Sequence, residues 1–435
     1  MFQQEAKEAA SSRVVPDGGF KAWMVVFASF LMSFIQDGFS LTFGLLLLPL
    51  VEHFNVGRTE ASFTSSVHTF LTIGSAPVGV LLIKKTSHRI CSVIGTMIAI
   101  LGLLLSGLYI QFATQDHLNI VVIYITLGGM TGLGLGLIYF SAIDVLNSFF
   151  DKKLGTANGI ASAGSGLGQM AIAPLITWTL TGYGMAGSLY AMTALVGSCI
   201  VFAFFYKTPE QAEEKEACSK NQKEEATMWS VLKDFKFLLI LTSQFLWYLA
   251  VFCALSFTTD RALKRGLTDL AGSTILLSIM GFTNLIGRLV WGPIIDKYKS
   301  KILLFSFSAM TTLAASVFVS EFLTTFAALA VYAGLVGFSL GAQVTSSVVI
   351  LQVVFGRVTE RLGIYLFIIG ASGVVANFLV GQTFDTTGSY TYGFLASGSL
   401  SFLGACLPLI IQIFWTPMEQ LEEKKGSDMV TCENA

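Results

Sequence analysis

The sequence predicts an all-α membrane protein with twelve transmembrane helices in two pseudo-symmetric six-helix bundles. Three observations predict this fold class. Of the 435 residues, 54% are hydrophobic and 12% are charged, and the mean hydropathy is +0.71, whereas soluble proteins carry about 25% charged residues. Apolar runs long enough to cross a bilayer recur along the chain. One long polar stretch divides these runs into two equal sets.

The spans follow in order, since a transmembrane helix needs about 20 mostly apolar residues. The first set comprises residues 22–48, 61–83, 90–112, 119–147, 156–180 and 186–206. The second set comprises residues 237–258, 270–295, 302–321, 324–354, 362–384 and 391–415. Small residues recur at four-residue spacing inside them, as at Gly128, Gly132 and Gly136. This spacing indicates close helix packing, and not a phosphate loop, which would follow a strand in water.

The domain organisation follows from the polar stretch at residues 207–236, which we expect to be a cytoplasmic central loop. It separates an N-terminal six-helix bundle, residues 1–206, from a C-terminal bundle, residues 237–415. Residues 416–435 are expected to form a cytoplasmic tail.

The two halves resemble each other at similar offsets. Ile73–Gly79 is matched by Ile286–Gly292, and Tyr124 by Tyr332. Such repeats indicate an internal duplication, with the halves related by an axis along the membrane normal and a binding site between them near mid-membrane.

Lys and Arg residues predict the orientation, because cytoplasmic loops carry an excess of them. With the N-terminus inside, 21 of the 26 lie on the inner side, 4 on the outer side, and Arg288 lies within a span. Both termini are therefore expected in the cytoplasm. The first twenty residues hold no apolar core of the secretory type, so we expect the first span to act as the insertion signal.

Composition argues against several other functions. A formal charge of -1 and a pI near 6.4 give no basic field for nucleic acid. The six cysteines and four histidines are scattered, without metal-ligand or disulfide spacing. No nucleophile, base or metal cluster of an enzyme is visible. We therefore expect no metal, no cofactor and no enzymatic activity.

The loop after the eighth span carries a recognisable motif. Gly292–Lys301 reads GPIIDKYKSK, which resembles the cytoplasmic loop signature of the major facilitator superfamily. The resemblance implies that Asp296, with Lys297 and Lys301, forms a gating loop that bonds a neighbouring helix end and stabilises the outward-facing state. The first half has Ile83 at the Asp position, so any latch there must be built differently.

Asp144 is a second acid near the end of a span, and we place it at the inner mouth with a structural or gating role. Its expected partners are basic residues of the loops on the same side, namely Lys152, Lys153, Arg357 and Arg361.

Two further segments resemble the monocarboxylate transporter family, the solute carrier group called sixteen. Pro16–Trp23, PDGGFKAW, is similar to that family's entry motif, although it inserts Lys21 and has Phe20 where Trp is usual. Phe149–Gly168 is similar to its fifth-span run, in which an aromatic pair and basic residues precede Ala-Asn-Gly. Together with the spans and the central loop, the resemblance covers nearly the whole chain.

The resemblance implies a secondary transporter that moves a small organic monocarboxylate by alternating access, either facilitative or proton-linked. It also implies the plasma membrane as location and a single-span immunoglobulin-like glycoprotein as a partner. Two alternatives stay open: a carrier of aromatic or other amino acids and larger carboxylates, and a non-transporting membrane sensor or scaffold.

Arg288 is the leading binding candidate, because a charge inside a span is costly and usually functional. Its planar guanidinium suits a carboxylate, and the resemblance implies that role. Proton-coupled relatives carry an Asp four residues earlier and a Lys in the first span; here the positions hold Asn284 and Leu41. Asn cannot exchange a proton near neutral pH. The alternative is an Arg that snorkels or pairs for structure.

Asp37 lies four residues before Leu41, on the same helix face. Our hypothesis is that it replaces the missing carboxylate as partner of Arg288, either as a proton acceptor or as a fixed counter-ion. The alternatives are that it caps a helix break beside Gly38 or bonds a neighbouring hydroxyl. Further substrate-binding candidates in the seventh and tenth spans are Tyr248, Gln343 and Ser347.

Overall fold

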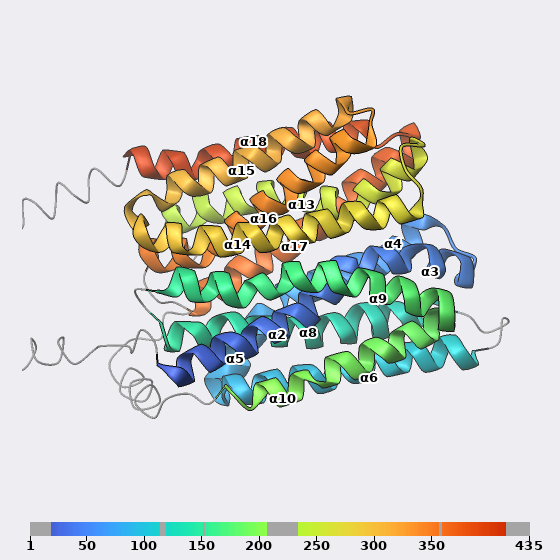
Figure 1. The fold of residues 1–435 in the computed structure, drawn as a ribbon, viewed down its shortest axis with the longest axis horizontal. Coiled ribbons are helices and arrows are strands. Elements are labelled where there is room, and N and C mark those ends of the chain that lie inside the picture. Colours follow the sequence, from blue (N-terminus) through green and yellow to red (C-terminus); the bar gives the residue numbers. More distant parts are fainter. Residues whose placement is uncertain (1–18, 114–118, 151–152, 207–233, 356–358, 415–435) are drawn as a thin grey trace, which may run out of the picture.

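The computed structural model describes residues 19–113, 119–150, 153–206, 234–355 and 359–414 (Figure 1). Every regular element in these ranges is helical, which confirms the predicted all-α class. Most of the expected central loop and all of the expected tail lie outside the described residues, as do Asp17 and the start of the entry motif.

The N-terminal half consists of long helices joined by short helical turns. Its elements are α2 (Phe20–Thr42), the 3₁₀ turn η1 (Phe43–Leu46), α3 (Leu47–Phe54), α4 (Arg58–Gly74), α5 (Ala76–Lys85), α6 (His88–Phe112), α7 (Ile120–Ile123), the π-helix η3 (Tyr124–Met130), α8 (Thr131–Asp144), η4 (Val145–Ser148), α9 (Leu154–Gly197) and α10 (Cys199–Ala203).

The C-terminal half is built from long helices as well. Its elements are α13 (Phe235–Lys264), α14 (Leu270–Lys297), η5 (Lys299–Lys301), α15 (Ile302–Val319), η6 (Ser320–Phe322), α16 (Phe326–Phe355), α17 (Thr359–Thr387) and α18 (Thr391–Phe414).

Among the described residues, 11 helices are long and apolar enough to cross a membrane. One of them, Leu154–Ala203, has 50 residues, which is about twice the length that a bilayer needs. Gly184 interrupts it with φ 69° and ψ −173°, a conformation that glycine adopts without steric cost. The predicted spans 156–180 and 186–206 therefore correspond to the two arms of this one continuous run.

The first span differs from its prediction. We expected one helix over residues 22–48. In the structure the α-helix ends at Thr42, the 3₁₀ turn η1 follows, and the helical path continues to Phe54. Thr42 Oγ1 donates to Gly38 O (2.7 Å) and Phe39 O (3.1 Å). Such back-bonding bends helices, so α2 ends one turn beyond Asp37.

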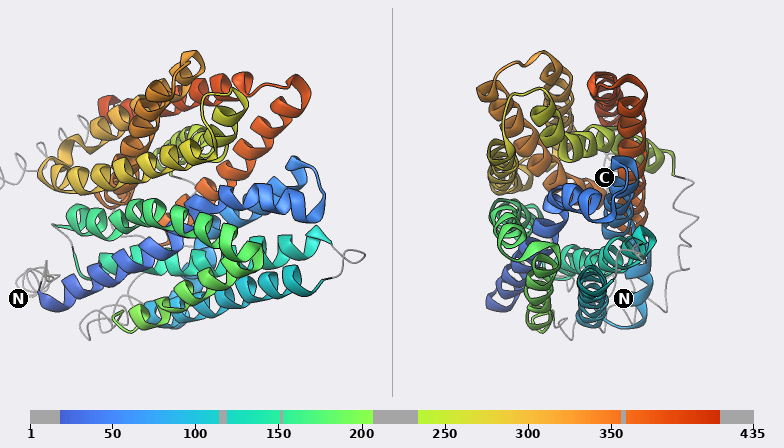
Figure 2. Two further views of the ribbon diagram at one scale, coloured as in Figure 1. Left: turned by 45° about the vertical axis from the view of Figure 1, so that its right-hand side comes forward. Right: turned by 90° about the vertical axis from the view of Figure 1, so that its right-hand side faces the viewer.

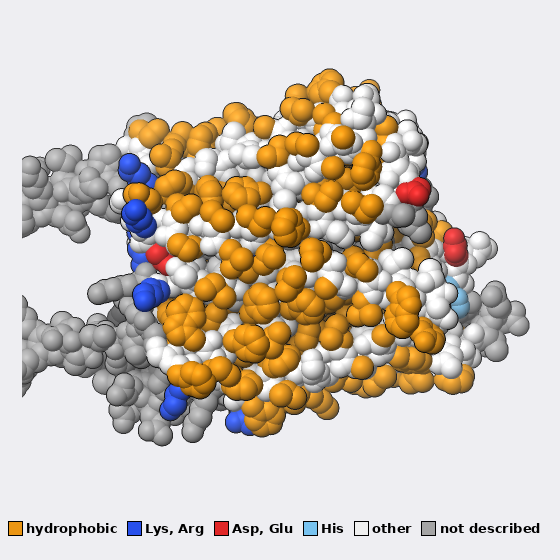
Figure 3. All heavy atoms as spheres, in the orientation of Figure 1, with side chains coloured by type: hydrophobic (Ala, Val, Ile, Leu, Met, Phe, Trp, Pro, Cys, Tyr) orange, Lys and Arg blue, Asp and Glu red, His pale blue; other side chains and the backbone are white. Residues whose placement is uncertain are grey.

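The two halves lie against each other with the axes of their long helices roughly aligned, and Figure 2 shows the same two groups from two further sides. Lys and Arg side chains gather at one end, while apolar side chains cover most of the visible face (Figure 3). We name this end the basic end; α5 and α14 finish there, at Lys85 and Lys297. The opposite end, where α4 and α14 begin, is the far end.

Glycines let the halves and their helices approach closely. A Cβ on Gly166 of α9 would lie 2.5 Å from Leu285 N of α14, and one on Gly159 would lie 2.7 Å from Arg288 O. Within the N-terminal half, a Cβ on Gly164 would lie 2.0 Å from Phe30 O of α2. These contacts agree with the expected small-residue packing.

Replacing Gly164 with Ala is therefore expected to destabilise the protein. The added methyl group meets backbone that cannot turn away, and overpacking of this kind costs about 1–3 kcal/mol. Thermal unfolding in detergent measures the effect as a lower melting temperature. Gly182→Ala in the same helical run is the control, because nothing lies within 4 Å of its added Cβ. Equal melting temperatures for the two variants would contradict the close α2–α9 contact.

Candidate functional site

A cavity lies between the two halves in the part of the molecule toward the far end. It is lined from the N-terminal half by Asp37, Ser40, Leu41, Phe43, Gly44, Leu47, Leu50, Ala61, Ser62, Ser65, Thr69, Thr72 and Ile73, and from the C-terminal half by Phe252, Leu255, Ser256, Phe257 and Asn377. Asp37 is the one charged side chain among these described lining residues. The cavity thus offers an apolar and hydroxyl-bearing wall with one carboxylate.

The break in the first span shapes this cavity. Because the helix ends after Thr42, the chain turns through η1 and presents Phe43 and Leu47 to the cavity. Ser40, also on the wall, lies 3.2 Å from His68 Nε2 of α4. The His68 ring stacks on Phe43 with centroids 4.4 Å apart. These contacts hold the broken segment against α4.

Arg288 lies buried in α14, with 4% of its surface exposed. Its Nε donates to Asn284 Oδ1 (2.8 Å), one turn earlier on the same helix, and its Nη1 donates to Ser162 O of α9 (3.0 Å). Gly159 permits this approach, because a side chain there would collide with the Arg288 backbone. Arg288 therefore spans the boundary between the halves and is held in one orientation.

The outer nitrogen of that guanidinium is unused by the protein. Within the described part of the chain, no acceptor bonds Arg288 Nη2, and no carboxylate lies within 4 Å of Arg288. Two hydrogen bonds to Asn284 and Ser162 fix the group and leave Nη2 without a hydrogen bond among the described residues; Arg288 lies behind the cavity wall and is not one of its lining residues. A fixed guanidinium with free donors is the arrangement that bidentate carboxylate recognition requires.

Asp37 lies on the cavity wall, on α2. It is half-buried, lines the cavity, and is close enough to Arg288 to interact electrostatically. Ser165 of α9 lies beside its carboxylate. The two charges come from opposite halves and do not form a contact pair, as no ion pair joins them among the described residues.

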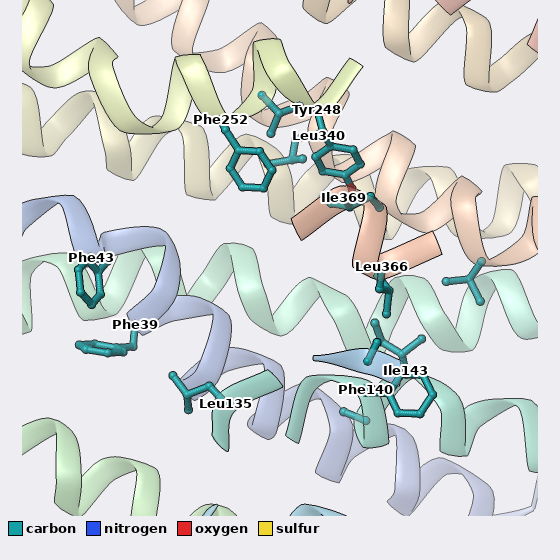
Figure 4. Close-up of a cluster of buried hydrophobic side chains, with 14 of the residues drawn as sticks. Phe39, Phe43, Leu135, Phe140, Ile143, Tyr248, Phe252, Leu340, Leu366 and Ile369 are labelled. Carbon is teal, nitrogen blue, oxygen red and sulfur yellow. The ribbon is translucent and has the colours of Figure 1, made fainter. Parts of the chain in front are cut away.

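Three tyrosines surround these charges. Tyr139 of α8 and Tyr248 of α13 each interact electrostatically with both Asp37 and Arg288. Tyr365 of α17 lies close to both of these tyrosines, and its hydroxyl donates to Gln244 Oε1 (3.2 Å). Figure 4 shows Tyr248 projecting from α13 toward the N-terminal half.

The two candidates of the tenth span, Gln343 and Ser347, lie in different surroundings. Gln343 Oε1 accepts a hydrogen bond from Ser306 Oγ of α15 (2.8 Å), so this side chain is directed into the C-terminal half and not toward Arg288. Ser347 Oγ donates to Gln343 O (2.8 Å) and lies beside Tyr365. Ser347 thus borders the charged group, whereas Gln343 is not part of it.

Asp296 joins the two halves at the basic end. Its Oδ1 accepts from Gly155 N (2.9 Å), and its Oδ2 accepts from Thr156 N (2.7 Å) and Thr156 Oγ1 (2.5 Å). A carboxylate of the C-terminal half therefore caps the first turn of α9, where free N–H groups and the helix dipole favour negative charge. Lys297 and Lys301 are exposed beside it.

Among the described residues of the first half, the position equivalent to Asp296 is Ile83, which cannot make such bonds. Instead α5 approaches α17 closely, since a Cβ on Gly363 would lie 2.8 Å from Val80 and 3.7 Å from Pro77. The corresponding contact is therefore a close packing of small residues.

Asp144 has a partner that the sequence analysis did not name. Its Oδ2 lies 3.1 Å from His88 Nε2, and both side chains are buried. Arg361, one expected partner, instead bonds Phe355 O (3.1 Å) and Asp234 Oδ2 (3.4 Å). Two others, Lys152 and Arg357, lie outside the described residues. The two side chains meet because α6 begins at His88 beside the end of α8.

A second buried charge escaped the sequence analysis. The predicted seventh span ends at residue 258, before Arg261, but α13 extends through Arg261, and 2% of the surface of this residue is exposed. It donates to Glu321 Oε1 (2.6 Å) and Ser320 Oγ (3.0 Å), and its guanidinium lies 3.9 Å from the Phe394 ring centre. This group closes the far end of the C-terminal half and does not reach the cavity.

Comparison with known proteins identifies relatives of the whole chain. The family model of the Major Facilitator Superfamily matches residues 22–376. Monocarboxylate transporter 4 of Gallus gallus is 26% identical, with 88% of this chain and 80% of that protein covered. Monocarboxylate transporter 12-B of Danio rerio is also 26% identical, with 98% and 95% covered.

Solved structures resemble the fold. The E. coli fucose:proton symporter FucP matches with a TM-score of 0.65 at 15% identity, covering 88% of this chain and 99% of that one. The proton:xylose symporter XylE matches with a TM-score of 0.68 at 14% identity, covering 90% and 95%. At these identities the likeness concerns the fold alone.

Proposed function

This chain belongs to the Major Facilitator Superfamily and is a secondary transporter, and from this premise we propose that it carries a small organic monocarboxylate. The proposal rests above all on Arg288. The guanidinium is buried at the boundary of the two halves, held by Asn284 and Ser162, with donors free for a ligand. The relatives named monocarboxylate transporters favour the same chemistry.

Alternating access is the proposed mechanism, with one half rocking on the other around a mid-membrane site. Asp296 ties the halves together at the basic end, and the cavity lies toward the far end. This combination supports an outward-facing state, in which substrate enters along Phe43 and Phe252 toward Asp37. Transport then requires the Asp296 contact to open.

The division of the chain into two bundles and the orientation of these bundles in the membrane are part of this proposal. Residues 1–206 and 237–415 are the moving bundles, and 207–236 links them. The Lys and Arg residues of the basic end support a cytoplasmic location for that end and for both termini. We place the protein in the plasma membrane, with a single-span immunoglobulin-like glycoprotein as a candidate partner for delivery to the surface.

Reconstitution in liposomes tests the proposed function. Purified protein is assayed with a panel of labelled small monocarboxylates, with matched alcohols as neutral controls, in the presence and absence of an inward proton gradient. Saturable uptake of at least one carboxylate and none of the alcohols is the expected result. Stimulation by the gradient that is lost in Asp37→Asn assigns Asp37 the proton-acceptor role, and insensitivity of the unmodified protein to the gradient supports the counter-ion role. Absence of carboxylate uptake above protein-free liposomes contradicts the proposal.

A further inference from the structure

We propose that His68 is a positioning residue, which sets the shape of the far-end cavity and through it the affinity for substrate. His68 lies on α4 with 0% of its surface exposed, and its imidazole stands behind the described residues that line the cavity. It therefore acts on the cavity wall and not on the substrate itself. This inference rests on the proposed function in one respect, namely that substrate enters through this cavity.

The His68 ring bridges the break in the first span. Before the break, its Nε2 lies 3.2 Å from Ser40 Oγ, and its ring meets Phe39 edge-on with centroids 5.7 Å apart. After the break, the ring stacks on Phe43 with centroids 4.4 Å apart and an angle of 21° between the planes. Phe39 and Phe43 also meet edge-on, and Figure 4 shows these two rings close together. One imidazole thus fixes α2 and η1 relative to each other.

These contacts determine where the cavity wall lies. Ser40 and Phe43 both line the cavity, so the imidazole holds one wall residue on each side of the break. The helix that carries it is firmly supported by α8, since a Cβ on Gly132 would lie 2.8 Å from His68 O. A change at the imidazole therefore moves both wall residues, and the chain that follows them, including Leu47 on the same wall, moves as well.

A histidine makes both contacts with one side chain. Phenylalanine would stack on Phe43 without bonding Ser40, and glutamine would bond Ser40 without stacking. The buried imidazole is only partly satisfied, because Nδ1 lies beside the Leu127 backbone without a hydrogen bond of normal geometry. An unsatisfied buried polar atom destabilises a protein, so packing alone would favour an apolar side chain here. A polar ring at this place agrees with a positioning role.

The transport test removes the two contacts separately. His68→Phe keeps the stack and removes the bond, Ser40→Ala removes the same bond from the other side, and His68→Gln keeps the bond and removes the stack. Each variant is expected to raise the KM of carboxylate uptake in proteoliposomes about 5-fold. The maximal rate should stay unchanged, because only binding is affected. The double variant of His68→Phe and Ser40→Ala should have the KM of either single variant, since both changes remove one bond.

His53→Gln is the matched control. His53 lies beyond the break on α3, where its ring meets Phe54 edge-on with centroids 5.1 Å apart, and its variant should have the KM of the unmodified protein. An unchanged KM in Ser40→Ala and His68→Phe overturns the inference. So does a lower maximal rate at an unchanged KM, because that pattern indicates a general loss of folded protein. KM effects that multiply in the double variant also overturn it.

A labelling measurement keeps this inference separate from the proposed function. Leu47 lies beyond the break and Ser65 lies on α4, and both line the cavity. His68→Gln is expected to change the rate at which Leu47→Cys reacts with an impermeant maleimide added at the far end, and to leave the rate of Ser65→Cys unchanged. Equal rates at Leu47→Cys with and without His68→Gln overturn the inference. Absence of carboxylate uptake by the unmodified protein defeats the proposed function, and the labelling rates then decide whether His68 shapes the cavity.

Discussion

Replacing Arg288 with Lys is expected to reduce carboxylate uptake by at least 100-fold. Lysine keeps the positive charge, but it loses the planar fork and the hydrogen bonds to Asn284 Oδ1 and Ser162 O that orient it. Each charge-assisted hydrogen bond to a ligand contributes about 1.5–3 kcal/mol. The loss of a bidentate pair therefore amounts to about 3 kcal/mol, or roughly two powers of ten. Initial uptake rates in proteoliposomes measure this effect.

Arg265→Lys provides the matched control. Arg265 is partly exposed at the far end and pairs with Glu321, away from the cavity. Its variant should transport at the unmodified rate. If Arg288→Lys were well folded by thermal unfolding and transported normally, Arg288 would have no role in binding the substrate.

Replacing Asp296 with Asn is expected to shift the protein away from the state with a far-end cavity. The carboxylate accepts three hydrogen bonds from Gly155 and Thr156 of the other half, and its charge interacts favourably with the start of α9. The amide keeps part of this contact and loses the charge, which we value at about 2 kcal/mol. A population change of roughly 30-fold follows.

Cysteine accessibility measures this shift. Ser256 lines the cavity, so Ser256→Cys is expected to react quickly with a membrane-impermeant maleimide added at the far end. Labelling should slow markedly when Asp296→Asn is combined with it. Asp269→Asn is the control and should leave the rate unchanged, because Asp269 caps the start of α14 at the far end, where its Oδ1 accepts from Gly272 N (2.8 Å), and Asn caps helices equally well. Undiminished labelling would show that the Asp296 contact does not hold the two halves together.

Hydropathy predicted the fold because every helix that crosses the bilayer needs about 20 mostly apolar residues. Twelve apolar segments with one polar interruption leave few other architectures open. The predicted helix boundaries were less accurate where a local backbone feature sets the end of a helix. The turn at Gly184 and the break at Thr42 depend on a glycine conformation and a hydroxyl bond to the helix backbone, and average hydropathy contains neither.

The charged candidates of the site were visible in the sequence for the same reason. Arg288 and Asp37 stand out because ions inside a span are costly. Uncharged residues give no such signal, so the sequence could not separate Ser347, which borders the charged group, from Gln343, which bonds Ser306. Tyr365 was missed because it is one phenol within an apolar run.

Partners across the bundle were the least predictable feature. Asp144 bonds His88, 56 residues earlier in the chain, which the sequence analysis did not name as a partner. Arg261 pairs with Glu321, 60 residues later. Such contacts depend on which helix ends are neighbours, and a single sequence does not contain that information.

The most direct measurement compares a carboxylate with its neutral amide as competitors for uptake, in the unmodified protein and in Arg288→Gln. The carboxylate should be whichever member of the panel is transported fastest. The account predicts that the amide competes at least 100-fold more weakly in the unmodified protein, and that the two compete equally in Arg288→Gln. Undiminished discrimination in Arg288→Gln would contradict the assignment of Arg288 as the group that recognises the carboxylate.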